Sequence, residues 1–166
     1  KSLKTKNICK KIGISSYSEN DLKLFKKYKF DIIQFPVNIF DQRILKKKNE
    51  NLIKKKNIEV HVRSIFLQGL LIRSDFMEKK FKLFKEFKKL DRFVLNNGID
   101  KLTTCLYFIY KIKYVKLVVI GVDSLEQLAE IKKKINFVKK NKIKISLNKF
   151  NYLRSNNKKL IDPRRW

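Results

Sequence analysis

Four short segments rich in Ile and Val occur at intervals along the chain, and amphipathic segments with helical periodicity separate them. The predicted strands are residues 11–16, 31–36, 59–66 and 116–121. Each is apolar with little strict alternation, which is typical of parallel strands covered on both faces. Alternating strands and helices favour a parallel sheet with right-handed crossovers. The pattern predicts an α/β fold with four parallel strands, either a small open sheet or half of an eight-stranded barrel.

Helices are predicted where apolar residues recur at three- and four-residue spacing. Ser18 and Asp21 have the spacing of a capping box, and Asp123 or Ser124 is expected to cap the last helix. Residues 147–166 are polar and are expected to form a C-terminal tail over the core. The predicted helices are residues 21–27, 42–56, 77–97, 99–110 and 125–134.

Length and composition are those of one globular domain. The chain has 166 residues, of which 43% are hydrophobic and 12% aromatic, and this is enough for one hydrophobic core. Its longest apolar runs fall far short of the roughly 20 residues that a membrane span needs. The chain begins at Lys1 and its one methionine is Met77. We therefore expect a truncated reading frame whose true N-terminus lies elsewhere.

The two cysteines, Cys9 and Cys105, are far apart and belong to no Cys-x-x-Cys or Cys/His cluster. This pattern supports neither a metal site nor a disulfide framework, and it favours a reducing, cytoplasmic setting. Cys105 lies in an apolar run, where we expect a buried, unreactive thiol.

The formal net charge is +27, from 42 Lys and Arg against 15 Asp and Glu. Such an excess is typical of proteins that bind nucleic acid or anionic membranes. The basic residues are mostly Lys, however, and the chain is also rich in Asn, Ile and Phe, which have A/T-rich codons. Proteins that read bases or grip phosphates in bidentate geometry favour Arg. We therefore favour compositional bias and expect only weak, salt-sensitive contacts with polyanions.

Polar residues stand where the predicted strands end, which is where α/β proteins keep their sites. Ser15 and Ser16 end the first strand, and Gln34 lies near the end of the second. Arg63 and Gly121 have similar positions on the third and fourth. Taken singly, such a Ser or Gln is more often a cap than a ligand. His61, the one histidine, alternates with valines and is interpreted as structural.

Together these segments resemble strands five to eight of the aldo/keto reductase superfamily, over nearly the whole chain. Residues 12–16 are similar to the family's Ile-Gly-Val-Ser-Asn pattern, and Gln34 matches a Gln of the sixth strand. Residues 63–71 match the seventh strand, where the family has an aromatic residue, then Ser, then a Gln-Gly-Leu-Leu element. Residues 121–130 match the eighth strand and its helix, and the Asp-Pro-Arg-x-Trp ending is also similar. The resemblance implies a partial (β/α)8 TIM barrel over residues 1–166, with the N-terminal half absent.

The resemblance also implies a nicotinamide cofactor site and its residues. Ser15, Ser16 and Gln34 correspond to residues that hydrogen-bond the nicotinamide carboxamide. Arg63 replaces the ring that stacks on nicotinamide, a role a guanidinium plane can also fill. NADP is expected from family habit, but Gln127 replaces an Arg that binds the 2′-phosphate, so NAD stays open. The implied cofactor-binding residues are Ser15, Ser16, Gln34, Arg63, Ser64, Phe66, Gln68, Gly121, Val122, Asp123, Gln127 and Glu130.

The implied activity is interconversion of a small carbonyl compound and its alcohol by hydride transfer. The family's catalytic Asp, Tyr, Lys and His lie on earlier strands, so no residue of this chain is assigned a catalytic role. The chain alone is expected to be inactive, with two open sheet edges and an apolar inner face that completion of the barrel would cover. Two alternatives remain. One is a catalytically silent regulatory or scaffold subunit of the same fold, and the other is a basic nucleic-acid-binding protein.

Overall fold

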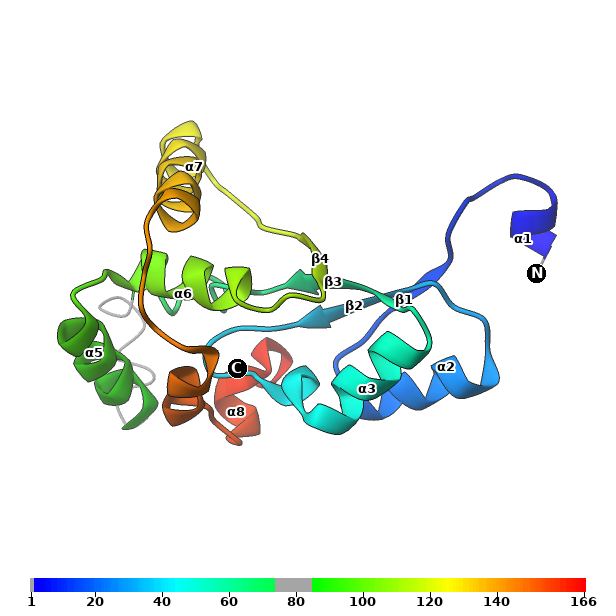
Figure 1. Cartoon of the computed structure of the whole chain (residues 1–166), viewed down its shortest axis with the longest axis horizontal. Helices are drawn as coiled ribbons and strands as arrows, with labels where there is room; N and C mark the ends of the chain where they lie inside the picture. Colours follow the sequence, from blue (N-terminus) through cyan, green and yellow to red (C-terminus); the bar gives the residue numbers. More distant parts are fainter. Residues whose placement is uncertain (1, 74–84) are drawn as a thin grey trace. The chain divides into compact units, whose positions relative to one another are not determined.

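The computed structural model describes residues 2–73 and 85–166. The contacts divide them into two compact units, each described by itself. The sheet unit comprises residues 1–36, 43–63 and 114–119, and the helical unit comprises residues 37–42, 64–113 and 120–166. Figure 1 shows the elements in chain order: α1 (Ser2–Thr5), β1 (Gly13–Ser15), η1 (Glu19–Lys23), α2 (Leu24–Lys27), β2 (Ile32–Pro36), η2 (Arg43–Leu45), α3 (Lys47–Lys55), β3 (Glu59–Arg63), α5 (Lys85–Asn97), α6 (Lys101–Tyr110), β4 (Val115–Val118), α7 (Leu125–Lys140), η3 (Leu147–Leu153), α8 (Lys158–Ile161) and η4 (Pro163–Arg165).

The sheet has four parallel strands in the order β1-β2-β3-β4, as the sequence predicts. Ser15 is level with Gln34, and Gln34 is level with His61. A register irregularity between Val60 and His61 shifts the pairing with β4. The strands are shorter than the predicted segments, and β4 begins one residue earlier than predicted. β3 ends at Arg63 because Ser64 has a left-handed backbone conformation, with φ of 58°.

Fully buried side chains alternate with partly exposed ones along β3, and along β2 as far as Phe35. The prediction of strands covered on both faces was therefore wrong for these two strands. One face is apolar and fully buried, and its members include Ile33, Phe35, Val60 and Val62. The opposite face carries mainly polar side chains, so the expected apolar inner face was also wrong. The polar face consists of Ser15, Gln34, Glu59, His61 and Arg63, with apolar residues at Ile32, Pro36 and Leu117.

The helices of the sheet unit begin at the predicted signals. Ser18 caps η1 and its side chain accepts a hydrogen bond from the Asn20 amide. The predicted helix over residues 21–27 therefore starts as a 3-10 turn and continues as α2. The predicted helix over residues 42–56 is likewise divided into η2 and α3. Both α2 and α3 lie on one side of the sheet in Figure 1.

The core of the helical unit is built around the ring of Phe150, which is 0% exposed. The ring centroids of Phe93 and Phe108 lie 5.0 and 5.1 Å from it, and that of Tyr107 lies 6.4 Å away. The Gln42 amide donates to the Phe150 carbonyl at 2.8 Å. Contacts between buried aromatic rings stabilise a fold by more than the burial of their apolar surface alone. Phe150 belongs to residues 147–166, which are therefore an integral part of this unit's core.

Side-chain caps define the starts of α6 and α7. Asp100 accepts from the Thr103 amide at 2.8 Å, and Ser124 accepts from the Gln127 amide at 3.3 Å. Ser124 is thus the cap predicted for the last helix, which continues past residue 134 to Lys140. The first part of the predicted helix over residues 77–97 lies outside the described residues, and its remainder is α5.

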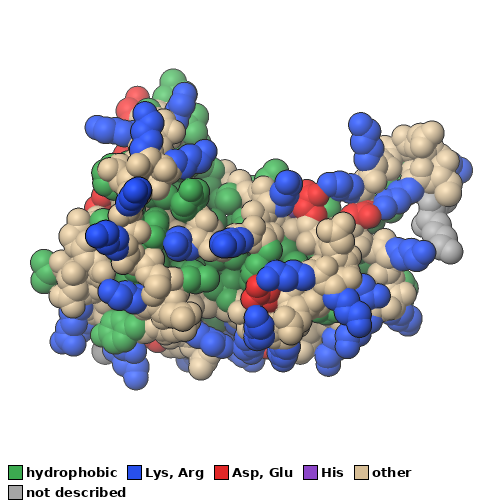
Figure 2. All heavy atoms as spheres, in the orientation of Figure 1, with side chains coloured by type: hydrophobic (Ala, Val, Ile, Leu, Met, Phe, Trp, Pro, Cys, Tyr) green, Lys and Arg blue, Asp and Glu red, His purple; other side chains and the backbone are tan. Residues whose placement is uncertain are grey.

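Lys and Arg side chains are distributed over the helices of both units on the face shown in Figure 2. They do not gather on one element in this view. Among the described helices, none is both long and apolar enough to cross a membrane.

Candidate functional site

The carboxyl ends of the four strands lie at one edge of the sheet because the strands are parallel. Ser16 directly follows β1, and Ser64 directly follows β3. Gly121 follows the end of β4 by a few residues, and Gln34 lies inside β2 shortly before its end. The predicted site residues therefore lie in or directly follow the carboxyl-terminal parts of the strands, where α/β proteins have their binding sites.

Ser15 and Gln34 form the centre of the polar face at this end. They are level with each other on neighbouring strands, and the Ser15 hydroxyl donates to Gln34 Oε1 at 3.3 Å. No described residue accepts a hydrogen bond from the Gln34 amide nitrogen. The pair therefore presents two amide N–H donors together with acceptor oxygens on an accessible face.

Arg63 is held in place by two contacts with the loop after β1. Its two terminal nitrogens donate to the Ser16 carbonyl at 3.3 and 3.2 Å. Its guanidinium carbon lies 4.3 Å from the centre of the Tyr17 ring, which is a cation–π contact. The sequence reasoning gave Tyr17 no part in the site. The one signal for it is the missing aromatic residue at position 63, since Tyr17 supplies a ring from the loop after β1, on the far side of β2.

The Ser16 side chain is 3% exposed and is used within the chain. Its hydroxyl bonds with the Ser18 carbonyl at 2.9 Å and with the Asp21 carboxylate, and it accepts from the Ser18 amide at 3.0 Å. These bonds fix the turn that leads into η1. The structure thus gives the hydroxyl a different part from the carboxamide contact expected of it, while the Ser16 carbonyl anchors Arg63.

His61 lies on the same polar face, level with Gln34 on the neighbouring strand. Its Nε2 is 2.8 Å from Glu59 Oε1, and Lys11 also bonds the Glu59 carboxylate. The Lys11 ammonium, and secondly His61, hold the pKa of Glu59 below its usual value. His61 is therefore part of a polar network inside the sheet unit, in agreement with its interpretation as a structural residue.

The loop after β3 contains an unusual concentration of left-handed backbone. Ser64, Leu67 and Gln68 have φ angles of 58°, 49° and 53°, and Gly69 follows at 82°. Asn38, 1% exposed, donates to the Ser64 carbonyl at 3.2 Å. Non-glycine residues in this region are strained, and such strain concentrates at ligand-binding sites. Phe66 in the same loop is half-buried, and Gln68 is exposed.

The segment after β4 is open to solvent. Gly121, Val122 and Asp123 are exposed, and a Cβ placed on Gly121 would have no neighbour within 4 Å. No contact within the described chain therefore explains a glycine at this position. The Gln127 side chain is partly engaged, because its Oε1 accepts from the Asp123 amide at 3.0 Å. Glu130, one turn further along α7, is exposed.

The predicted site residues fall into two groups, one in each unit. Ser15, Ser16, Gln34 and Arg63 belong to the sheet unit, where the contacts above bring them together. The second group belongs to the helical unit and consists of Ser64, Phe66, Gln68, Gly121, Val122, Asp123, Gln127 and Glu130.

Neither cysteine belongs to the group formed by Ser15, Ser16, Gln34 and Arg63. Cys105 is 1% exposed, and burial raises the pKa of its thiol to about 12, as expected of an unreactive cysteine. Cys9 is also a free thiol. In residues 2–73 and 85–166, no cluster of three or more His, Cys, Asp or Glu side chains is arranged to hold a metal ion.

Four consecutive parallel strands with covering helices and polar carboxyl ends define part of a (β/α)8 barrel. The sequence profile of the aldo/keto reductase family matches residues 1–150. The chain therefore belongs to the aldo/keto reductase family, as the sequence resemblance predicts.

Solved structures agree on the fold. The apo form of an aldo-keto reductase from Bacillus halodurans has a TM-score of 0.68 and 19% identity, over 99% of this chain and 57% of that chain. Its holo form gives 0.67 and 18%, over 99% and 56%. A glycerol dehydrogenase from Gluconobacter oxydans gives 0.53 and 18%, over 82% and 51%. The chain thus spans little more than half the length of these structures. Among curated proteins, none matches the chain significantly.

Proposed function

We propose that this chain is the cofactor-binding part of an NAD(P)H-dependent oxidoreductase that interconverts carbonyl compounds and alcohols. Membership of the aldo/keto reductase family supports this class of reaction. The observation that carries the proposal is the Ser15–Gln34 pair beside the fixed Arg63, at the carboxyl end of a parallel sheet.

The donor set of the polar face fits a nicotinamide carboxamide. This group has one carbonyl that accepts and one amide that donates, and Gln34 can satisfy both. The Ser15 hydroxyl adds a further polar contact and orients the Gln34 oxygen. Arg63 offers a planar group for the face of the nicotinamide ring. In this proposal Ser16 acts through its carbonyl, which holds Arg63, and its hydroxyl supports the turn.

For the second group of residues, which belongs to the helical unit, the family resemblance supports a proposed role in contacting the phosphates and adenosine. The strained turn at Ser64 to Gly69 and the bare backbone at Gly121 are suited to close approach by phosphate oxygens. Phe66, Val122, Asp123 and Glu130 are proposed to contact the same groups, and Gln127 to face the adenosine ribose. We propose NADP because it is the usual cofactor of the family. NAD stays open as the alternative, because Gln127 carries no charge that would select a 2′-phosphate.

The bound nicotinamide would supply or accept the hydride. The chain's own residues would fix which face of the ring meets the substrate, since Gln34 holds the carboxamide and Arg63 covers one side. A general acid for the carbonyl oxygen is proposed to come from the strands that complete the barrel. Those strands would also cover the open edges of β1 and β4. The two free cysteines favour a reducing, cytoplasmic setting for the complete protein.

The proposal is tested by Gln34→Ala in the natural gene product that contains residues 1–166. Loss of a positioning hydrogen bond should weaken NADPH binding by about 2- to 10-fold, or on the order of 0.5–1.5 kcal/mol. Turnover of a carbonyl substrate should fall further, because a misplaced ring slows hydride transfer. Asn51→Ala, at an exposed position on α3, is the matched control. Unchanged binding and turnover in Gln34→Ala would contradict the assignment.

Turnover also separates the enzyme from a catalytically silent scaffold of the same fold. A scaffold would bind the cofactor without reducing any carbonyl compound. Gln127→Arg tests the cofactor choice, because a guanidinium near the ribose should raise the preference for NADP over NAD. An unchanged ratio of the two dissociation constants would remove Gln127 from the site.

A further inference from the structure

The charge of Arg63 is fixed in position at the carboxyl end of β3. Two hydrogen bonds to the Ser16 carbonyl and the stack on Tyr17 hold the guanidinium against the loop after β1. A guanidinium stays protonated at any pH at which the protein is folded. These contacts hold the positive charge at this position.

No carboxylate among the described residues forms an ion pair with this guanidinium. Glu59, on the same face of β3, is already paired with Lys11 and His61. Asp21 is engaged by the Ser16 hydroxyl. The Tyr17 ring attracts the charge but does not neutralise it. Arg63 thus contributes a net positive charge to the face that carries Gln34 and Ser15.

We propose that Arg63 makes this site bind the reduced cofactor in preference to the oxidised one, which favours use of the enzyme for carbonyl reduction. This inference rests on the proposed function. The nicotinamide ring is neutral in NADPH and carries one positive charge in NADP⁺. A guanidinium beside the electron-rich reduced ring makes a favourable cation–π contact, whereas beside the oxidised ring it faces a like charge.

The two redox forms isolate this effect, because their phosphates and adenosine are identical. Any difference in affinity then reports the surroundings of the nicotinamide ring alone. An uncharged aromatic residue at position 63 would stack on both forms without the like-charge penalty. With Arg63 the oxidised cofactor should leave more readily after hydride transfer and compete less with the reduced form for the empty site.

The experiment is calorimetric titration of NADPH and NADP⁺ into the natural gene product that contains residues 1–166. We expect NADP⁺ to bind about tenfold more weakly than NADPH. Arg63→Phe should bring the two affinities to within about threefold, chiefly because binding of NADP⁺ becomes tighter. Arg63→Lys keeps the charge and should keep most of the preference. Arg63→Gln removes the charge without adding a ring, and it serves if Arg63→Phe does not fold.

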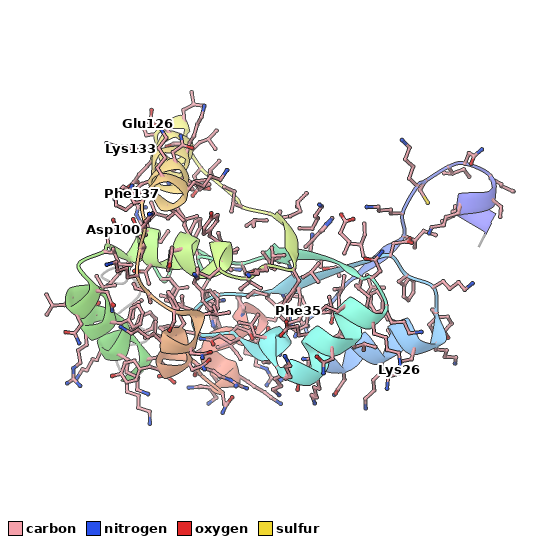
Figure 3. The ribbon with its side chains drawn as sticks, in the orientation of Figure 1. Lys26, Phe35, Asp100, Glu126, Lys133 and Phe137 are labelled. Atoms are coloured by element: carbon pink, nitrogen blue, oxygen red, sulfur yellow. The ribbon has the colours of Figure 1, made fainter. Side chains whose placement is uncertain are left out.

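Lys26→Gln is the matched control, because it removes one positive charge from an exposed position on α2 in the same unit. Lys26 is labelled on α2 in Figure 3. This variant should leave the affinity ratio unchanged. If both forms bind but neither Arg63→Phe nor Arg63→Gln alters their ratio, the inference is overturned and the proposed function stands. If no form of NAD or NADP binds, the proposed function itself fails.

Discussion

The sheet unit and the helical unit are stabilised in different ways. The sheet unit depends on a four-stranded backbone ladder with one apolar face, and its other face keeps polar and charged groups accessible. The helical unit surrounds one ring, Phe150, with aromatic neighbours, and its predicted site residues lie on loops and at the start of α7. In the sheet unit, therefore, paired strands fix the positions of the charged and amide side chains. In the helical unit, loops with left-handed backbone offer main-chain groups instead.

The largest effect is expected from Phe150→Ala, which removes the centre of the helical unit. Truncation of a fully buried Phe costs about 3–5 kcal/mol. Amide hydrogen exchange should therefore show loss of protection in α5 and α6 well before β2 and β3. Tyr152→Ala is the control, because that ring is 49% exposed and lies outside the buried cluster around Phe150. Equal loss of protection in both units would contradict the conclusion that the two units are stabilised in different ways.

The sheet unit has its own sensitive point at Gly13. A Cβ at this position would lie 2.6 Å from the Ile32 carbonyl oxygen, so β1 and β2 approach too closely for any side chain. Gly13→Ala should destabilise the protein by roughly 2–3 kcal/mol in chemical denaturation. The matched change Gly121→Ala meets nothing within 4 Å and should have little effect. A reversed order of the two variants would show that the close approach is not required.

Within the helical unit, Asp100 connects the start of α6 with α7. Its carboxylate caps α6 through Thr103 and pairs with Lys134 of α7 at 2.6 Å (Figure 3 labels Asp100). Asp100→Ala should cost about 1–2 kcal/mol, since it removes both a cap and a link between the helices. Ser124→Ala, which removes a single exposed cap, should cost about half as much in thermal unfolding. Equal costs would mean that the Lys134 contact contributes nothing.

The smallest effect concerns pH. Arg164 holds the pKa of Asp162 at about 2, below its ordinary value of 3.8. A depressed pKa stabilises the fold above the unfolded value, and this stability is lost as the pH falls from about 4 through 2. Asp162→Asn should therefore lower stability by about 1 kcal/mol at pH 7 and by much less at pH 2, where the Asp162 carboxyl is partly protonated in the folded state. A difference that persists undiminished at pH 2 would assign the effect to the cap of η4.

The order and direction of the strands were predictable because strand segments and helix caps leave local signals. Ser18 and Ser124 cap helices as the sequence predicts. The alternation in β3 was visible in part, since His61 alternates with valines in the sequence, but Glu59 and Arg63 were not assigned to the same face as His61. The length of α7 was also missed, although Ile131, Ile135 and Val138 continue the helical spacing of apolar residues past residue 134.

Residues of the candidate site could be predicted only where they match positions in the sequence pattern of the aldo/keto reductase family. Ser15, Gln34 and Arg63 share one edge of the sheet as expected, because parallel strands align their ends. The stack of Arg63 on Tyr17 depends on how the loop after β1 folds back, and the burial of the Ser16 hydroxyl depends on the turn into η1. Neither feature has a periodic pattern in sequence, so both required the structure.

The edge strand β4 has a further consequence for the chain in solution. Leu117 and Val118 of β4 are 45% and 39% exposed, and Val119 directly after the strand is 42% exposed. In the described sheet β4 has one unpaired edge. Such an edge invites strand addition between copies, while the net charge of +27 opposes it by mutual repulsion. The Debye length falls from about 10 Å at 0.1 M salt to about 3 Å at 1 M. Colloidal stability should therefore be highest in dilute buffer, and added salt should promote self-association.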